Sequence, residues 1–241
     1  LARLADTIGR ATDYLAQYEF AAARIEVEKF FWTELCDYYL EIAKARLYDG
    51  ESPGARYTLH HALLTVTKLL APFIPHVTEA VYTGAFAESD GHGSVHASRW
   101  PQPLAGWTSG NEHSVAVGNA ILEVTDAVRR WKSDRKLSVA APLGHIVVRA
   151  PVAICDGLRE AARDLVGVTR AGTLSVEVGD DDVDVRGRAD GAEAALHLNA
   201  GVDGGRMHDH RRRVGDGLPR DVGDVGLDRV APRTPRGRLD D

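Results

Sequence analysis

The residues whose types and spacing could do chemistry are concentrated in one short basic run, RRWKSDRK, at residues 129–136. The run holds five cations and one acid in eight residues. Arginine can grip a phosphate group with two parallel hydrogen bonds, and lysine adds a compact positive charge. The run therefore predicts binding of a phosphodiester backbone by Arg129, Arg130, Trp131, Lys132, Arg135 and Lys136, with the Trp131 ring either stacked on a base or buried. The alternative is that these cations complement the negative end of a helix dipole and stay solvated.

The stretch that must position such a site is residues 20–46, which contain no Gly or Pro. Apolar residues recur there at intervals of three and four, which predicts a helix of about seven turns with one buried stripe. The stripe is predicted to consist of Ala23, Val27, Phe31, Leu35, Tyr38 and Ile42. Four further candidates for RNA binding lie on or near the polar side of this helix: Arg24, Lys29, Lys44 and Arg46. Phe20 and Trp32 could stack on unpaired bases, although we expect Trp32 to belong to the core.

Composition narrows the classes of function. The chain has 241 residues and a formal net charge of −6, which argues against a general nucleic-acid coat and requires any RNA binding to come from a local basic patch. Cys36 and Cys155 have no metal-ligand spacing, and the adjacent His60 and His61 point to different helix faces, so we predict no metal site. Two unpaired cysteines, no long apolar run and no signal-peptide layout predict a cytoplasmic protein that does not enter a membrane.

Three segments carry a family resemblance. They are FFWTELCDYYLEIAKARLY at residues 30–48, LAPFIPHVTEAVY at 70–82, and VRRWKSDRKLSVAAPL at 128–143. In this order they resemble the anticodon-binding region of valyl-tRNA synthetases, with archaeal-type features, and the resemblance covers residues 1–185. Isoleucyl and leucyl enzymes are the alternatives within the same class I group, and the letters Cys36-Asp37 and Tyr39-Leu40-Glu41 favour the valyl type. Cys36 and Asp37 match the family motif, but we interpret them as structural rather than base-contacting.

The resemblance implies a function in recognising the anticodon side of a tRNA, with valine-specific tRNA as the expected partner. The His-x-Gly-His and Lys-Met-Ser-Lys-Ser motifs that such enzymes use for ATP do not occur in the chain. We therefore predict no catalytic residue and no cofactor in this chain, with ATP and Mg²⁺ bound by a missing upstream catalytic domain of the intact, monomeric enzyme. Two other interpretations stay open: a stand-alone RNA-binding remnant, and a helical protein-interaction module without an RNA role.

The expected fold is mainly α-helical, with three parts. Residues 1–137 are predicted to form a helical bundle, and residues 138–185 a small β-α-β appendix. The last part, residues 186–241, is predicted to be disordered or out of frame, since residues 201–241 contain 8 Gly, 9 Arg and 8 Asp and no aromatic residue. The chain begins with Leu1 and its only methionine is Met207, so we expect it to be the C-terminal part of a longer protein.

Overall fold

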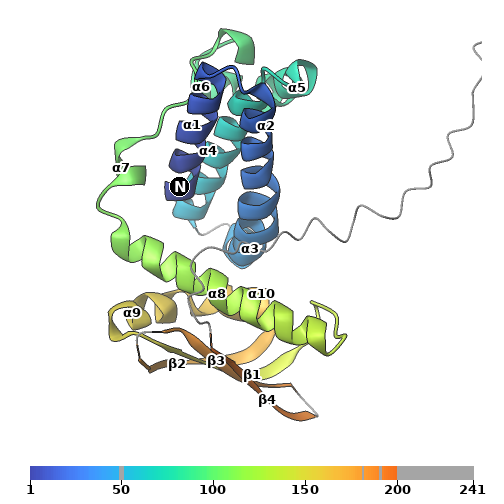
Figure 1. The fold of residues 1–241 in the computed structure, drawn as a ribbon, viewed down its shortest axis with the longest axis vertical. Coiled ribbons are helices and arrows are strands. Elements are labelled where there is room, and N and C mark those ends of the chain that lie inside the picture. Colours follow the sequence, from blue (N-terminus) through green and yellow to red (C-terminus); the bar gives the residue numbers. More distant parts are fainter. Residues whose placement is uncertain (49–51, 181, 190–191, 200–241) are drawn as a thin grey trace, which may run out of the picture. The chain divides into compact units, whose positions relative to one another are not determined.

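The computed structural model describes residues 1–48, 52–180, 182–189 and 192–199 (Figure 1). The N-terminal part is helical, as predicted, and begins with α1 (Ala2–Ala16). A short turn at Gln17–Glu19 leads into the central helix, so α1 and the next helix pack side by side. Leu4, Ile8 and Ala11 of α1 are buried in the core that the two helices share.

The central helix is continuous, but its middle is π-helical. It consists of α2 (Phe20–Lys29), the π-helix η1 (Phe30–Leu40) and α3 (Glu41–Tyr48). Hydrogen bonds in a π-helix span five residues, so residues five apart share a face. Phe30 and Leu35 are buried accordingly, whereas Phe31, predicted from an α-helical period, is only half-buried. The prediction that Trp32 is a core residue is wrong, because its side chain is 59% exposed.

Further helices complete the first core. They are α4 (Pro53–Leu70), α5 (Pro75–Ala85), α6 (Ala87–Asp90), the 3₁₀ turn η2 (Val95–Ala97) and α7 (Ala105–Thr108). The helix α4 begins with a side-chain cap, since Ser52 Oγ accepts a hydrogen bond from the Ala55 amide at 3.3 Å and Pro53 takes the first helical position. The segment between α5 and α8 packs on the helices, since Val95 and Trp107 are buried.

The second core combines a long helix with a sheet. Its elements are α8 (Glu112–Asp134), β1 (Leu143–Ala150), α9 (Val152–Glu160), α10 (Ala162–Thr169), β2 (Ala171–Val178), β3 (Asp184–Ala189) and β4 (Ala192–Asn199). The strand order is β2-β1-β3-β4, with β1 and β2 parallel and the other pairs antiparallel. The predicted β-α-β unit is confirmed, with its helix divided into α9 and α10. We call β1 to β4 with α9 and α10 the α/β module.

The structure bears on both predicted boundaries. The predicted bundle, residues 1–137, includes α8, and the apolar residues Val117, Val124 and Val128 of this helix are buried with the α/β module. The tail was predicted to begin at residue 186, yet β3 and β4 occupy residues up to Asn199. Strands pair through backbone hydrogen bonds, which need no aromatic residue and no long apolar run. The composition of these residues therefore did not indicate that they form strands. Residues 200–241, which carry the rest of the predicted tail, lie outside the described residues.

Candidate nucleic-acid interface

The predicted basic run does not act as one surface, because the structure divides it between buried and exposed positions. Arg129 faces the central helix: its Nη2 atom donates to the Asp37 carbonyl at 2.8 Å, and its guanidinium lies 5.2 Å from the centre of the Tyr38 ring. Tyr38 in turn donates to Asp126 Oδ1 at 2.7 Å. Burial, followed by the hydrogen bond to Asp126, raises the pKa of Tyr38 above its ordinary value. Arg129 therefore joins α8 to η1, and its guanidinium is already engaged by protein.

Lys132 is a structural residue, which corrects its prediction as a phosphate ligand. Its residue exposure is 1%, and its ammonium donates to the carbonyls of Val139 at 2.8 Å, Ala141 at 2.6 Å and Thr169 at 3.0 Å. All three donors of an ammonium group are used by these bonds. Burial lowers the pKa of Lys132, and the positive charge of Arg170 acts in the same direction. Lys132 therefore fastens the loop after α8 to the end of α10 and cannot reach a phosphate.

Trp131 is buried, which is one of the two alternatives predicted for its ring. It is 4% exposed and belongs to the second core, and Arg135 covers it with its guanidinium 4.4 Å from the ring centre. Such a cation–π contact leaves the hydrogen-bond donors of the guanidinium available. The ring of Trp131 therefore supports Arg135 and does not itself face a ligand.

Three cations of the run remain exposed, and we call Arg130, Arg135 and Lys136 the basic patch. In the described part of the chain none of them forms an ion pair with a carboxylate. Lys136 has a φ of 55°, in the left-handed region that closes helix ends, and its amide donates to the Ser133 carbonyl at 2.9 Å. The Leu137 amide donates to the Lys132 carbonyl at 2.9 Å, which completes the turn. The patch is thus held on a hydrogen-bonded helix end.

The four predicted cations of the central helix also differ from one another. Arg24 pairs with Glu28 at 2.8 Å and Lys44 with Glu41 at 3.3 Å, both on the exposed surface. Lys29 is exposed and has no partner among the residues that the structure describes.

Arg46, predicted as an RNA ligand, forms an ion pair within the fold. Its guanidinium holds Asp164 of α10 through two contacts, at 2.9 Å from Nε to Oδ1 and 2.8 Å from Nη2 to Oδ2. The Asp164 side chain is 6% exposed, so the carboxylate of this ion pair is shielded from solvent.

Exposed aromatic side chains form a second candidate feature. Tyr18 is 80% exposed and Phe20 55%, with ring centres 6.2 Å apart in a T-shaped arrangement at the turn between α1 and α2. Trp32 stands further along the central helix, T-shaped against Phe31 at 4.8 Å. We call Tyr18, Phe20 and Trp32 the aromatic set. The sequence analysis named Phe20 and Trp32 but missed Tyr18. The position of Tyr18 in the connection between two predicted helices could have indicated that it is exposed.

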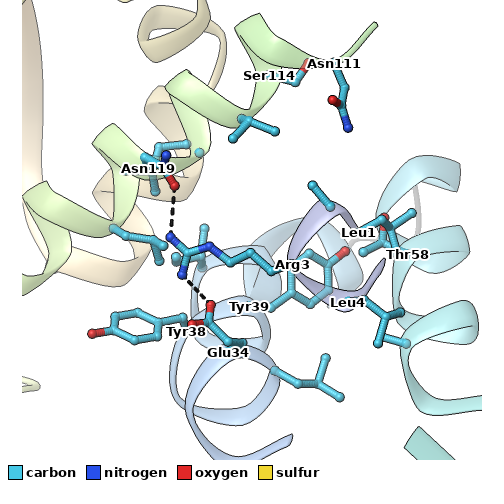
Figure 2. Close-up of a pocket in the computed structure, with 18 of the residues that line it drawn as sticks. Leu1, Arg3, Leu4, Glu34, Tyr38, Tyr39, Thr58, Asn111, Ser114 and Asn119 are labelled. Carbon is cyan, nitrogen blue, oxygen red and sulfur yellow. Dashed lines mark hydrogen bonds and ion pairs between the residues drawn. The ribbon is translucent and has the colours of Figure 1, made fainter. Parts of the chain in front are cut away.

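A cavity of about 460 Å³ separates the first helices from α8 (Figure 2). Arg3 crosses it, donating to Glu34 Oε2 at 2.6 Å and to Asn119 Oδ1 at 2.9 Å. The two arginines in its lining, Arg3 and Arg46, are both paired with carboxylates. The cavity therefore presents no spare positive charge for a phosphate group.

Among the described residues, the other reactive groups form no metal site. Cys36 is half-buried and Asp37 exposed; burial, and then the charge of Asp37, raises the pKa of the Cys36 thiol. The described residues contain no group of three or more His, Cys, Asp or Glu side chains that could hold a metal ion. Among the same residues, no helix has the length and apolar character needed to cross a membrane.

Comparison with known proteins decides the family. The family described as the anticodon-binding domain of tRNA ligase matches residues 1–148, which is more than half of the chain. The chain belongs to this family. The matched anticodon-binding domain ends inside β1, so it includes α8, whereas α9, α10 and the remaining strands follow it.

Individual relatives extend beyond the anticodon-binding domain. The valine–tRNA ligase of Haloarcula marismortui is 34% identical over 190 residues, which cover 76% of this chain and 20% of that ligase. The valine–tRNA ligase of Rickettsia rickettsii (strain Sheila Smith) is 35% identical over 193 residues, and that of Orientia tsutsugamushi is 36% identical over 182 residues. The chain spans about a fifth of the length of these relatives, since the covered shares are 20%, 22% and 21%.

Proposed function

We propose that the chain binds a tRNA and recognises its anticodon as part of a valine–tRNA ligase. The observation that carries this proposal is the match to the anticodon-binding domain over residues 1–148. Valine is proposed because similar proteins of 34–36% identity are valine–tRNA ligases. Isoleucine- and leucine-specific tRNA remain the competing outcomes of the test.

The exposed side chains suit this task. Anticodon bases must be unstacked to be read, and aromatic side chains can then stack on them. The aromatic set offers such surfaces on the first core, and the basic patch offers cations for phosphates on α8. Lys29, Arg24 and Lys44 could add charge along the central helix. Because the whole chain has a net charge of −6, binding should be local and sensitive to salt.

The chemistry of the intact ligase is assigned to residues outside this sequence. We propose that an additional catalytic region binds ATP and Mg²⁺ and joins valine to the tRNA, in a monomeric enzyme of the cytoplasm. The isolated chain should accordingly support neither aminoacylation nor ATP–pyrophosphate exchange. Activity of the purified chain above a control without protein would contradict this assignment.

The test compares tRNA transcripts that carry valine, isoleucine and leucine anticodons. Binding is measured by fluorescence anisotropy over a range of KCl concentrations. The wild-type chain should prefer the valine transcript, and the triple variant Arg130→Gln, Arg135→Gln, Lys136→Gln should bind all transcripts more weakly, with a shallower salt dependence. A wild-type chain that binds none of the transcripts at low salt would refute the proposal.

A matched control separates local from general charge effects. Arg10, Arg149 and Arg159 are exposed cations in ion pairs elsewhere on the chain. Changing all three to glutamine removes the same formal charge as the triple patch variant. Equal losses of affinity in the two triple variants would mean that net charge, rather than the basic patch, governs binding.

A further inference from the structure

Arg170 is a cation of the α/β module in an unusual backbone conformation. It follows the last residue of α10, has a φ of 60° and is exposed. Its carbonyl accepts the Leu143 amide at 2.8 Å, which fixes its backbone to the start of β1. The described part of the chain offers its guanidinium no hydrogen bond or ion pair.

The hydrogen bonds of Lys132 bring the end of α10 to the end of α8. The Lys132 ammonium binds the carbonyl of Thr169, the residue directly before Arg170, and also the carbonyls of Val139 and Ala141 in the loop that follows α8. The sequence separation between Lys132 and Thr169 is 37 residues. A segment remote in sequence is therefore held beside the helix end that carries the basic patch.

The left-handed residues of the described chain share a pattern. The non-glycine residues with positive φ are Tyr18, Lys136 and Arg170. Each directly or closely follows the end of a helix, where glycine is the favoured residue because it adopts this conformation without strain. Each instead carries an exposed aromatic or cationic side chain. Strained backbone conformations are often found at functional sites, so these exposed side chains are candidates for ligand binding.

The helix end and loop that Lys132 joins to the Arg170 segment carry few acids. Residues 128–143 contain a single acid, Asp134. The nearest acid within α10, Asp164, is buried and bound by Arg46. The effect of Arg170 on the buried ammonium of Lys132 indicates that the two charges are close.

We propose that Arg170 binds the tRNA phosphate backbone together with Arg130, Arg135 and Lys136, so that the α/β module takes part in holding the RNA. This inference rests on the proposed function. A phosphate that bridges these cations would offset their mutual repulsion, and a guanidinium can bind it with two hydrogen bonds. The competing explanation is that Arg170 only complements the negative end of the α10 dipole.

The test uses the full chain and a tRNA transcript with the valine anticodon. Dissociation constants are measured between low and moderate KCl for the wild type, Arg170→Gln, Arg170→Gly and Arg170→Lys. Arg170→Gln should weaken binding roughly three- to tenfold at low salt and lower the slope of log K against log salt by about one. Arg170→Lys should retain most of the slope, because it keeps the charge.

The variant Arg170→Gly separates a loss of RNA binding from a loss of stability. Glycine suits the left-handed conformation, so Arg170→Gly should melt at the wild-type temperature or above while losing the same salt slope as Arg170→Gln. Arg159→Gln is the matched control, since it removes one cation of α9 that is paired with Asp156 at 2.6 Å, and it should leave the slope unchanged.

The outcomes separate the inference from the proposed function. A wild-type chain that binds tRNA with the same affinity and slope as Arg170→Gln and Arg170→Gly would overturn the role of Arg170 alone. A wild-type chain that does not bind tRNA would overturn both. Equal losses in Arg170→Gln and Arg159→Gln would also reject a specific contact at Arg170.

Discussion

Arg46 on α3 holds Asp164 on α10 in a two-pronged ion pair, with contacts of 2.9 Å and 2.8 Å, although the residues are 118 positions apart. The pair joins the central helix to the α/β module. Burial raises the pKa of Asp164, and Arg46 counteracts that effect. An arginine that sequence spacing assigned to RNA is thus part of the contact between two cores.

Replacing Arg46 should destabilise the protein. Arg46→Met leaves the Asp164 carboxylate buried without its partner, and we expect the free energy of unfolding to fall by about 2–3 kcal/mol. Arg24→Met, which removes an exposed pair with Glu28, should cost less than about 0.5 kcal/mol. Urea unfolding measures both. The double change Arg46→Met, Asp164→Asn should recover part of the loss, and a double variant less stable than Arg46→Met would contradict this account.

Lys132 should matter for stability rather than for charge. Lys132→Met leaves three carbonyls without their donor, so we expect unfolding to become easier by about 2–3 kcal/mol. Lys136→Met removes the same charge from an exposed position, and its effect on stability should stay within about 0.5 kcal/mol. Thermal melting distinguishes the two. Similar melting temperatures for both variants would mean that the Lys132 hydrogen bonds contribute little.

The network around Asp90 should make stability depend on pH. Burial acts to raise the pKa of Asp90, but hydrogen bonds from Lys68 and Tyr82 outweigh it, so the pKa lies below its ordinary value of 3.8. A carboxylate with a lowered pKa contributes stability that is present above pH 3.8 and is lost as the pH falls through the folded-state pKa. Burial first, and then Asp90, raises the pKa of Tyr82 to about 12, so Tyr82 stays protonated throughout.

The measurement compares the wild type with Asp90→Asn. The variant should be less stable by about 1–3 kcal/mol at about pH 5, and the difference should shrink toward about pH 3. His92 Nδ1 lies 3.5 Å from Asp90 Oδ2, so the imidazole belongs to the same network. A difference that stays constant or grows as the pH falls would contradict the predicted sign.

Trp32 should affect RNA binding more than folding. Its side chain is 59% exposed, so Trp32→Ala should change the melting temperature little while weakening tRNA binding by roughly 1–3 kcal/mol if a base stacks on it. Tyr48→Ala, at another exposed aromatic of the central helix, is the comparison. Unchanged affinity in Trp32→Ala would remove Trp32 from the aromatic set.

Truncation should locate the end of the folded chain. A chain ending at Asn199 keeps β4, and we expect its melting temperature to stay within a few degrees of the full chain. A chain ending at Ala189 loses the strand that pairs with β3, for example at Val185 and Leu198, and should melt lower. Equal melting temperatures for both truncated chains would restore the shorter boundary that composition predicted.

The helices and the family resemblance could be predicted from the sequence, because their signals are local. The spacing of Ala23, Val27, Leu35 and Ile42 depends only on helical geometry, and the caps at Ser52 and Pro53 act within one turn. Charge composition likewise marked residues 129–136 as a candidate site. Local spacing could not reveal the π-helical middle of the central helix, because the change of period there moves Phe30 into the core in place of Phe31.

Only the tertiary structure decided what each cation does. Arg46, Arg129 and Lys132 have the same charge as Arg130 and Lys136, yet the first three meet acceptors that lie 118, 92 and up to 37 positions away. Such partners are set by packing between cores, where an unpaired buried acceptor would be costly. The same packing buried the apolar face of α8 against the α/β module and placed Arg170 beside the end of α8. Sequence therefore determined which residues could bind RNA, and long-range packing determined which of them remain free to do so.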